Sequence, residues 1–359
     1  MESIKTYLKG RGAQINPHNR FNQQEIILDV TDILDEEEQL EILQQKQSTK
    51  YIEVFPKSII NWVKSPDIPG LYSMNPYQGC EHGCTYCYAR PTHEYWGYSA
   101  GKEFEQNILI KKNAPKLLRE CFEKPDWQPS SIMLSGNTDC YQPAEKKFEI
   151  TRELLKVCLE FRHPVSIITK NALIARDADV LEQLAALNLV HLTFSLSTLN
   201  EDLKRVMEPR TSTAKNVLKT IELLSERKIP INVNVAPIIP SINDNEIFDL
   251  AKAVSGAGAL SIHYIVVRLN DKVEFVFKDW LEKIFPDRYQ KCIRQIESIH
   301  GGRVSDKRSF VLMRGEGNWA ELINRQFKMA EQKYFHNKNF PSLDTTIFIN
   351  SSKRQGKLF

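Results

Sequence analysis

The sequence Asn-Pro-Tyr-Gln-Gly-Cys-Glu-His-Gly-Cys-Thr-Tyr-Cys-Tyr-Ala-Arg-Pro occupies residues 75–91 and holds three cysteines in a C-x3-C-x2-C pattern. These cysteines are Cys80, Cys84 and Cys87. Thiolate is a soft ligand that suits iron–sulfur clusters, zinc and copper(I), and the close spacing lets one loop enclose a single metal centre. Gly79 and Gly83 allow the positive-φ turns that such a loop requires. Three cysteines without an obvious fourth leave one coordination position open, which predicts a centre that binds something rather than one that only holds a fold together.

The stretch resembles the cluster loop of the radical S-adenosylmethionine (radical SAM) superfamily, because an aromatic residue, Tyr86, stands just before the third cysteine. The resemblance implies that the cysteines ligate three irons of a [4Fe–4S] cluster, and that the fourth iron binds the amino and carboxylate groups of S-adenosylmethionine. It also implies that one electron cleaves this cofactor to a 5′-deoxyadenosyl radical, which abstracts hydrogen from a substrate. Tyr86 would lie near the adenine. The alternative is a zinc knuckle with His82 or His93 as the fourth ligand.

The composition is that of an ordinary globular protein, with 42% hydrophobic and 26% charged residues among 359. A formal charge of +3 is too small to argue for nucleic acid, although it leaves room for a local basic groove. Neither a long apolar run nor a signal-peptide pattern is present, so we expect no membrane association and a cytoplasmic location. The seven cysteines do not predict a disulfide framework. Four lie outside the motif and are typical of small buried residues: Cys121, Cys140, Cys158 and Cys292.

Strand patterns alternate with helical patterns six times from residue 71 onward. The predicted strands are 71–75, 131–135, 165–169, 189–195, 231–236 and 259–267. Such alternation predicts a parallel sheet with crossover helices. Six repeats fit an open (β/α)6 barrel, a partial TIM barrel, and the resemblance implies the same α/β architecture; a doubly wound open sheet is the alternative. We expect an N-terminal extension at 1–70, a core at 71–300 and a C-terminal extension at 301–359 with a helix at 318–333.

In barrels and open α/β sheets, ligands bind at the carboxyl ends of the strands. The second strand is followed by Ser135-Gly136-Asn137-Thr138-Asp139, where the small residues allow close backbone approach and Thr138 and Asp139 could hold an ammonium group. The superfamily binds the amino group of S-adenosylmethionine here, although its usual Gly-Gly-Glu is replaced in this chain. The alternative is a simple turn in which Asp139 caps the next helix.

The later strand ends supply further candidates. Lys170, after the third strand, can pair with a cofactor carboxylate, or it is an exposed surface lysine. Ser195 and Ser197, after the fourth strand, suit a ribose, and nearby Arg210 suits a carboxylate. Two further candidates follow the fifth and sixth strands. Ala236 begins an apolar turn that could form a wall for an adenine, and Arg268 is placed on the substrate side, unless it forms a structural ion pair.

Within the superfamily, the sequence resembles the spore-photoproduct-lyase-like branch. The residues that carry this resemblance are the three motif cysteines, Thr138-Asp139, Thr169-Lys170, Ser195 and Glu208-Pro-Arg210. Residues 75–95 match an uncharacterised subgroup throughout. The likeness to that subgroup covers about 9–320, and the likeness to the lyase about 71–270. The lyase carries a hydrogen-donor cysteine just before its Thr/Ser-Asp motif, where this chain has Ser135-Gly136-Asn137. Cys140, just after the motif, could serve as a hydrogen donor or redox thiol, or it fills the core.

The leading hypothesis is therefore a radical SAM enzyme that abstracts hydrogen from an unidentified substrate and receives electrons from a small protein such as flavodoxin or ferredoxin. Damaged DNA or another nucleic acid is one candidate substrate, because the lyase that the sequence resembles acts on thymine photoproducts. Basic and aromatic residues directly follow the cysteine loop, where aromatic rings stack on bases or equally often pack a lid. These residues are Arg90, His93, Tyr95, Trp96 and Tyr98. The competing hypothesis is an interaction module that binds zinc or an iron–sulfur cluster without catalysis.

Overall fold

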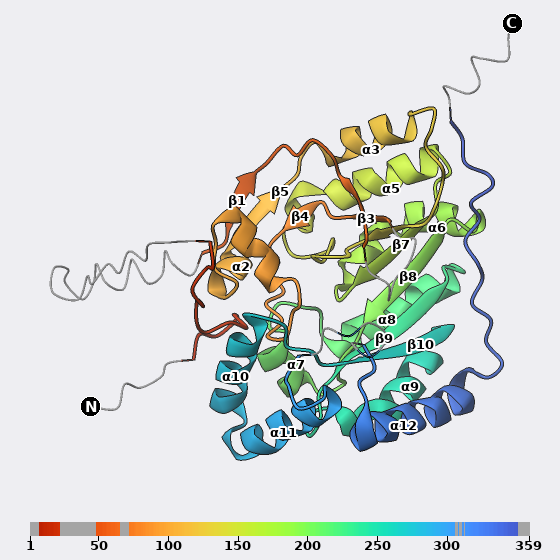
Figure 1. Ribbon diagram of the computed structural model, residues 1–359. Coiled ribbons are helices and arrows are strands. Elements are labelled where there is room, and N and C mark those ends of the chain that lie inside the picture. Colours follow the sequence, from red (N-terminus) through yellow and green to blue (C-terminus); the bar gives the residue numbers. More distant parts are fainter. Residues whose placement is uncertain are drawn as a thin grey trace, which may run out of the picture.

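The computed structural model describes residues 7–21, 48–64, 72–305, 308, 311 and 313–350, and Figure 1 draws their arrangement. Leu71, the first residue of the first predicted strand, lies outside the described residues. Parts of the two predicted extensions also lie outside them, namely 1–6, 22–47, 65–70, 306–307, 309–310, 312 and 351–359.

A seven-stranded sheet forms the centre of the molecule (Figure 1). Its strands, in spatial order, are β10 (Ser261–Val266), β9 (Ile231–Ile238), β8 (Val190–Ser195), β7 (Val165–Thr169), β6 (Ile132–Leu134), β3 (Tyr72–Met74) and β2 (Ile60–Trp62). The pairs from β10 to β3 are parallel, whereas β2 runs antiparallel to β3 at the edge. The six parallel strands follow one another in the order of the chain. A doubly wound sheet would change direction at a switch point, so the structure confirms the open (β/α)6 barrel.

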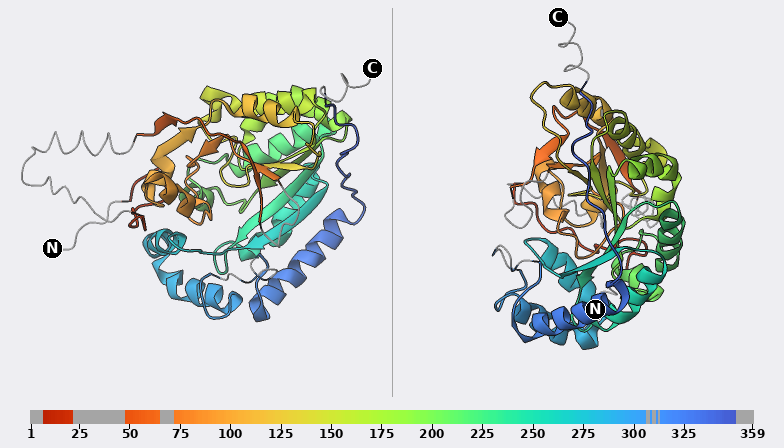
Figure 2. Two further views of the ribbon diagram at one scale, coloured as in Figure 1. Left: turned by 45° about the horizontal axis from the view of Figure 1, so that its top comes forward. Right: turned by 90° about the vertical axis from the view of Figure 1, so that its right-hand side faces the viewer.

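The helices that connect these strands lie on the outer side of the curved sheet (Figure 2). They include α3 (Ala114–Phe122), α5 (Ile150–Glu160), α6 (Ala178–Ala186), α8 (Ala214–Glu226) and α9 (Ile247–Gly256). In β8, Leu192 and Phe194 are fully buried, while His191 and Thr193 are partly exposed. This alternation is expected where one face of a strand packs against helices and the other points into the barrel.

The remaining elements complete the chain. They are α4 (Glu145–Phe148), η2 (Ala172–Asp177), α7 (Glu201–Met207), η3 (Asp244–Glu246), α10 (Val273–Ile284), η4 (Pro286–Arg288), α11 (Tyr289–Ile299) and α12 (Gly317–Phe335). The helical stretch between β6 and β7 is divided into α4 and α5, because Glu149 between them has a φ of 52°. In the part of the chain that the structure describes, no helix is long and apolar enough to span a membrane.

A second, three-stranded sheet lies beside the barrel and was not predicted. It consists of β1 (Lys50–Glu53), β5 (Asn107–Ile110) and β4 (Tyr77–Gln78), in the order β1-β5-β4. Between β4 and β5 the chain forms the cysteine loop, η1 (Arg90–Trp96) and α2 (Lys102–Gln106). The small sheet therefore holds both ends of the segment that carries the cysteines.

The C-terminal segment after α12 passes along the amino ends of the barrel strands. The amide of Asp344 donates to the carbonyl oxygen of Asn188, just before β8, at 2.8 Å. The amide of Ile349 donates to the carbonyl oxygen of Phe161, before β7, at 2.9 Å. His191 Nε2 lies 2.8 Å from the carbonyl oxygen of Pro341. This segment covers the end of the barrel opposite the cysteine loop.

Candidate active site

The three motif cysteines lie in one loop, and all three are free thiols. Cys80 and Cys84 are 6% and 7% exposed, and Cys87 is partly buried. Burial raises the pKa of each of the three thiols, and the neighbouring Cys84 and Cys87 raise that of Cys80 further. Thiols in such surroundings lose their protons only when positive charge is placed beside them. Iron would supply that charge, because a coordinating thiol is deprotonated.

Two glycines let the loop turn as predicted. Gly79 has a φ of 78° and Gly83 a φ of 67°. A Cβ atom on Gly79 would lie 2.7 Å from the carbonyl oxygen of Asn107. A Cβ atom on Gly83 would lie 3.0 Å from Oε2 of Glu105. Both positions therefore require glycine for the backbone conformation and for the close approach of neighbouring groups.

A buried ion pair supports the loop from outside. Arg90 and Glu105 are both 0% exposed, and their charged groups are 2.5 Å apart. Arg90 NH2 also donates to the carbonyl oxygen of Cys84 at 2.8 Å. The Glu105 carboxylate accepts from the amides of Gly12 at 3.1 Å and Ala13 at 2.8 Å. The N-terminal segment 7–21 therefore places Gly12 and Ala13 in buried positions against the loop.

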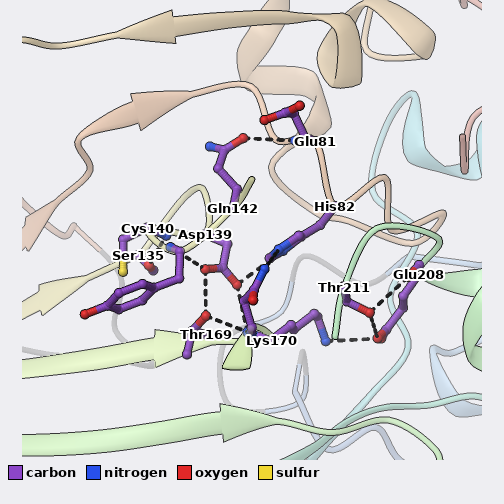
Figure 3. A network of polar contacts seen from close by, with 12 residues as sticks. Glu81, His82, Ser135, Asp139, Cys140, Gln142, Thr169, Lys170, Glu208 and Thr211 are labelled. Carbon is purple, nitrogen blue, oxygen red and sulfur yellow. Dashed lines mark hydrogen bonds and ion pairs between the residues drawn. The ribbon is translucent and has the colours of Figure 1, made fainter. Parts of the chain in front are cut away.

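Asp139 lies at the centre of a polar network beside the loop (Figure 3). Its Oδ1 accepts from Thr169 Oγ1 at 2.8 Å, and its Oδ2 accepts from the amide of Lys170 at 2.8 Å. His82, from the cysteine loop, places Nδ1 3.3 Å from Oδ2. Burial alone would raise the pKa of Asp139, but His82 and the hydrogen bonds outweigh it and lower that pKa. Asp139 also accepts from the amide of Tyr141 at 2.8 Å, so it stabilises its own turn as well.

Lys170 lies on the neighbouring strand end and is not a surface lysine. Its side chain is 15% exposed, and Nζ lies 3.2 Å from Oε1 of Glu208. Nζ also donates to the carbonyl oxygen of Ala236 at 3.3 Å, and it lies 5.5 Å from the centre of the Tyr86 ring. The structure thus brings together three residues that were predicted from the sequence. They are Tyr86 in the cysteine loop, Lys170 after β7 and Ala236 in β9.

The loop after β6 is held by its own hydroxyl groups. Ser135 has a φ of 80°, which is strained for a residue other than glycine, and its Oγ accepts from the amide of Cys140 at 2.7 Å. Thr138 Oγ1 donates to the carbonyl oxygen of Tyr77 at 2.8 Å. At Gly136, a Cβ atom would lie 2.4 Å from Oγ of Ser73.

The other predicted site residues occupy different surroundings. Ser195 and Ser197 are buried at the end of β8. Arg210 points toward the N-terminal segment, where its Nε donates to the carbonyl oxygen of Gly10 at 3.0 Å. Cys140 is 0% exposed and belongs to the main hydrophobic core, which favours the core-filling interpretation, although its role as a donor thiol stays a prediction. The guanidinium of Arg268 lies 5.2 Å from the ring centre of Tyr88, which follows Cys87 in the sequence.

The two histidines of the zinc alternative differ in their contacts, because both ring nitrogens of His82 face other side chains, whereas those of His93 are buried without a hydrogen-bond partner. His82 contacts Asp139 through Nδ1 and lies 3.2 Å from Asn171 Nδ2 through Nε2. The His93 ring stacks on Tyr98 with ring centres 5.1 Å apart. Among the described residues, no three His, Cys, Asp or Glu side chains are grouped so that they could hold one metal ion. A [4Fe–4S] cluster does not need such a group, because each cysteine ligates a different iron.

For two of the residues that follow the cysteine loop, the structure favours packing over contact with nucleic acid. Arg90 and His93 are both 0% exposed, so neither can contact an external ligand without a rearrangement of the loop. Tyr95 and Trp96 are 73% and 45% exposed and remain available.

Sequence reasoning missed the functional importance of two carboxylates. Glu105 supports the loop, and Glu208 contacts both Tyr86 and Lys170. Glu208 belongs to the Glu-Pro-Arg motif that the sequence analysis quotes, but only Arg210 of that motif was predicted to bind the cofactor. Glu105 gave no signal, because it lies in a short helix that the sequence pattern did not reveal.

Comparisons with known proteins agree with this geometry. Residues 74–254 match the sequence model described as the radical SAM superfamily. The chain is 30% identical over 249 residues to an uncharacterised protein of Mycobacterium tuberculosis, covering 68% of this chain and 73% of that one. It is 28% identical over 240 residues to an uncharacterised protein of Methanocaldococcus jannaschii, covering 67% and 85%. The chain belongs to the radical SAM superfamily.

Solved structures support the fold assignment. A mutant of spore photoproduct lyase superposes with a TM-score of 0.58 at 13% identity and 79% coverage of both chains. The lyase complexed with dinucleoside spore photoproduct gives a TM-score of 0.57 at 12% identity, again with 79% coverage of both chains. At this identity the likeness shows the fold alone.

Membership of the superfamily defines the cofactors as a [4Fe–4S] cluster and S-adenosylmethionine. The residues present fit this pair. Cys80, Cys84 and Cys87 are three free thiols in one loop, two buried and one partly buried, and three is the number that leaves one iron free for the cofactor. Asp139 and Lys170 add one negative and one positive group at adjacent strand ends, next to that loop.

Proposed function

We propose that this protein is a radical SAM enzyme that abstracts hydrogen from a substrate still to be identified. The observation that carries the proposal is the arrangement of the Asp139 carboxylate and the Lys170 ammonium group on the ends of β6 and β7, beside the three thiols of the cysteine loop. The amino-acid part of S-adenosylmethionine has one ammonium and one carboxylate group, so the two side chains complement it in charge.

Most of the predicted residues have a role in this proposal. Cys80, Cys84 and Cys87 ligate the cluster. Asp139 accepts from the cofactor's ammonium group, and Lys170 pairs with its carboxylate. Ser135, Gly136 and Thr138 form the loop that presents Asp139 to the ammonium group. The adenosine part is bound by four further residues: Tyr86, Ser195, Ser197 and Ala236. When bound, the cluster and S-adenosylmethionine together supply a 5′-deoxyadenosyl radical.

Nucleic acid is the first substrate class to test. Spore photoproduct lyase, which has a similar fold, is complexed with a dinucleoside photoproduct in one structure. In this chain Tyr88 is 44% exposed, and its hydroxyl donates to the carbonyl oxygen of Gly136 at 2.6 Å. With Arg268 beside it, this ring supplies a flat surface and a positive charge next to the site. Repair of the spore photoproduct itself is not part of the proposal, because no cysteine precedes Thr138-Asp139.

The radical requires one electron, and we propose flavodoxin or ferredoxin as the donor. The deciding experiment reconstitutes the protein without oxygen, adds dithionite and S-adenosylmethionine, and measures 5′-deoxyadenosine and methionine by chromatography. Formation of both supports the reaction class. A reducible cluster that binds the cofactor but gives no 5′-deoxyadenosine, with or without ultraviolet-irradiated DNA, would contradict it. Deuterium transfer from a labelled oligonucleotide into 5′-deoxyadenosine would identify nucleic acid as the substrate.

A further inference from the structure

Glu208, the residue after α7, is a buried carboxylate on which five side chains converge. It is 1% exposed. Its Oε1 accepts from the hydroxyl of Tyr86, from Ser197 Oγ at 2.8 Å and from Lys170 Nζ at 3.2 Å. Two further side chains contact Oε2, namely Lys204 Nζ at 2.6 Å and Thr211 Oγ1 at 3.4 Å. The partners come from the cysteine loop and from the ends of β7 and β8, as well as from α7 itself.

The two carboxylate oxygens of Glu208 have different partners, so one can stabilise the helix end while the other holds groups at the proposed cofactor site. Oε2 faces Lys204 on the preceding turn of α7, a pair that closes the helix end. Oε1 faces the three groups that lie at the proposed cofactor site. Removal of the carboxylate would therefore free Tyr86 and Lys170 at the same time as it breaks the helix contact.

Two ammonium groups share the Glu208 carboxylate. The side chains of Lys170 and Lys204 are 15% and 3% exposed, and both contact it. The Asp139 carboxylate, whose Oδ2 accepts from the Lys170 amide, supplies a second negative charge beside Lys170. The carboxylate of S-adenosylmethionine would pair with Lys170 and its ammonium group with Asp139, while Glu208 remains paired with Lys204.

We infer that Glu208 is a positioning residue, which holds the Lys170 ammonium group and the Tyr86 ring in place to receive S-adenosylmethionine. This inference rests on the proposed function, because it assigns Lys170 and Tyr86 to the cofactor. Glu208 also links the cluster loop to the barrel, since Tyr86 lies between the cluster ligands Cys84 and Cys87 while Lys170 and Ser197 follow β7 and β8. The arrangement of the loop and the affinity for the cofactor are therefore coupled through one carboxylate.

The test compares Glu208→Gln with a matched control, Glu145→Gln. Glu145 is also 0% exposed and bonded to a tyrosine and a cation, since it accepts from the Tyr77 hydroxyl and from Arg176 at 2.7 Å, but it lies outside the site. After anaerobic reconstitution, iron content, thermal unfolding and the dissociation constant for S-adenosylmethionine are measured for each protein. We expect Glu208→Gln to retain the cluster and to bind the cofactor at least 10-fold more weakly. Glu145→Gln should lose thermal stability and keep the wild-type affinity.

The outcomes are distinct. Cofactor affinity within twofold of wild type in Glu208→Gln, together with reduced stability, would show a structural role only and overturn the inference. A wild-type protein with a complete cluster that does not bind S-adenosylmethionine would overturn the proposed function and the inference together.

A second variant keeps the test valid if Glu208→Gln does not fold. Tyr86→Phe removes one hydroxyl and leaves the ring. We expect it to weaken cofactor binding about threefold or more, and to alter the change that the cofactor produces in the electron paramagnetic resonance spectrum of the reduced cluster. Wild-type affinity with a wild-type spectrum would overturn the inference.

Discussion

The backbone of Gly12 lies against that of Gly83, so closely that a Cβ atom on Gly12 would be 1.6 Å from the carbonyl oxygen of Gly83. Gly83 stands directly before Cys84, a proposed cluster ligand. A residue far outside the family match at 74–254 therefore takes part in the shape of the cluster loop. The adjacent Ala13 is fully buried, so the N-terminal segment is packed into the folded structure here and does not lie on its surface.

Gly12→Ala should disturb the cluster loop. The methyl group would force the N-terminal segment away from Gly83 and break the bonds from Gly12 and Ala13 to Glu105, a change that should cost about 1–3 kcal/mol of folding free energy. We expect fewer irons per chain after reconstitution and faster loss of iron to a chelator. Gly256→Ala is the control, because a Cβ atom there meets nothing within 4 Å. Equal iron retention by both variants would contradict the role of the contact.

Cys84→Ala should abolish the [4Fe–4S] cluster while the barrel remains folded, because Cys84 lies in a loop at the side of the sheet rather than in a strand. Iron and sulfide analysis with the visible absorption spectrum measures the cluster, and circular dichroism measures the fold. Cys121→Ala serves as the control, since Cys121 lies in α3, away from the loop. A Cys84→Ala protein that still holds four irons and cleaves the cofactor would refute the ligand assignment.

Asp139→Asn should weaken the binding of S-adenosylmethionine. The amide keeps an acceptor for Thr169 but loses the negative charge that faces the cofactor's ammonium group. A hydrogen bond to a charged group contributes about 1.5–3 kcal/mol, which corresponds to about a 10- to 150-fold loss of affinity. Equilibrium dialysis of the reconstituted protein measures this loss. If the affinity is unchanged, Asp139 only stabilises its turn through Tyr141.

Local sequence patterns were sufficient for the barrel and for the cysteine loop. The strands at 165–169 and 190–195 fall where their apolar runs predicted, because neighbouring strands in this fold are also neighbours in the sequence. The small sheet was missed because it pairs Lys50 with Asn107, two short segments far apart in the chain, and a local pattern can indicate a strand but not its distant partner.

The polar contacts of the site were harder to predict, because their partners are far apart in the chain. Glu208 bonds to Tyr86, 122 residues away, and to Lys170, 38 residues away. The sequence indicated Lys170 by its place after a strand, but no pattern places a glutamate at the end of α7 beside it. The Gly12–Gly83 contact is between backbones. The sequence shows that both residues lack a side chain, but it does not show that they meet.

Acid should destabilise the protein through His163, which lies just before β7. The ring is 0% exposed, stacks on Phe122 with centres 4.2 Å apart, and places Nδ1 2.9 Å from the carbonyl oxygen of Pro164. Burial lowers the pKa of His163 from 6.5 to about 4. Between these values the unfolded chain binds a proton that the folded chain does not. The stabilisation is therefore complete above pH 6.5 and is lost as the pH falls toward 4.

One such histidine adds a slope of about 1.4 kcal/mol per pH unit, or about 3 kcal/mol over the whole window. Urea unfolding of the wild type and of His163→Phe at pH 4.5, 5.5 and 6.5 measures this slope, and the phenylalanine keeps the stack on Phe122. We expect the free energy of unfolding of the variant to depend less on pH by about that amount. The exposed His336 provides a control, since His336→Gln should leave the wild-type slope intact. Parallel curves for wild type and His163→Phe would mean that the buried ring takes up its proton without unfolding. In that case the acid sensitivity would have to come from the buried carboxylates, with Glu208 first, because the lysines beside it outweigh burial and lower its pKa.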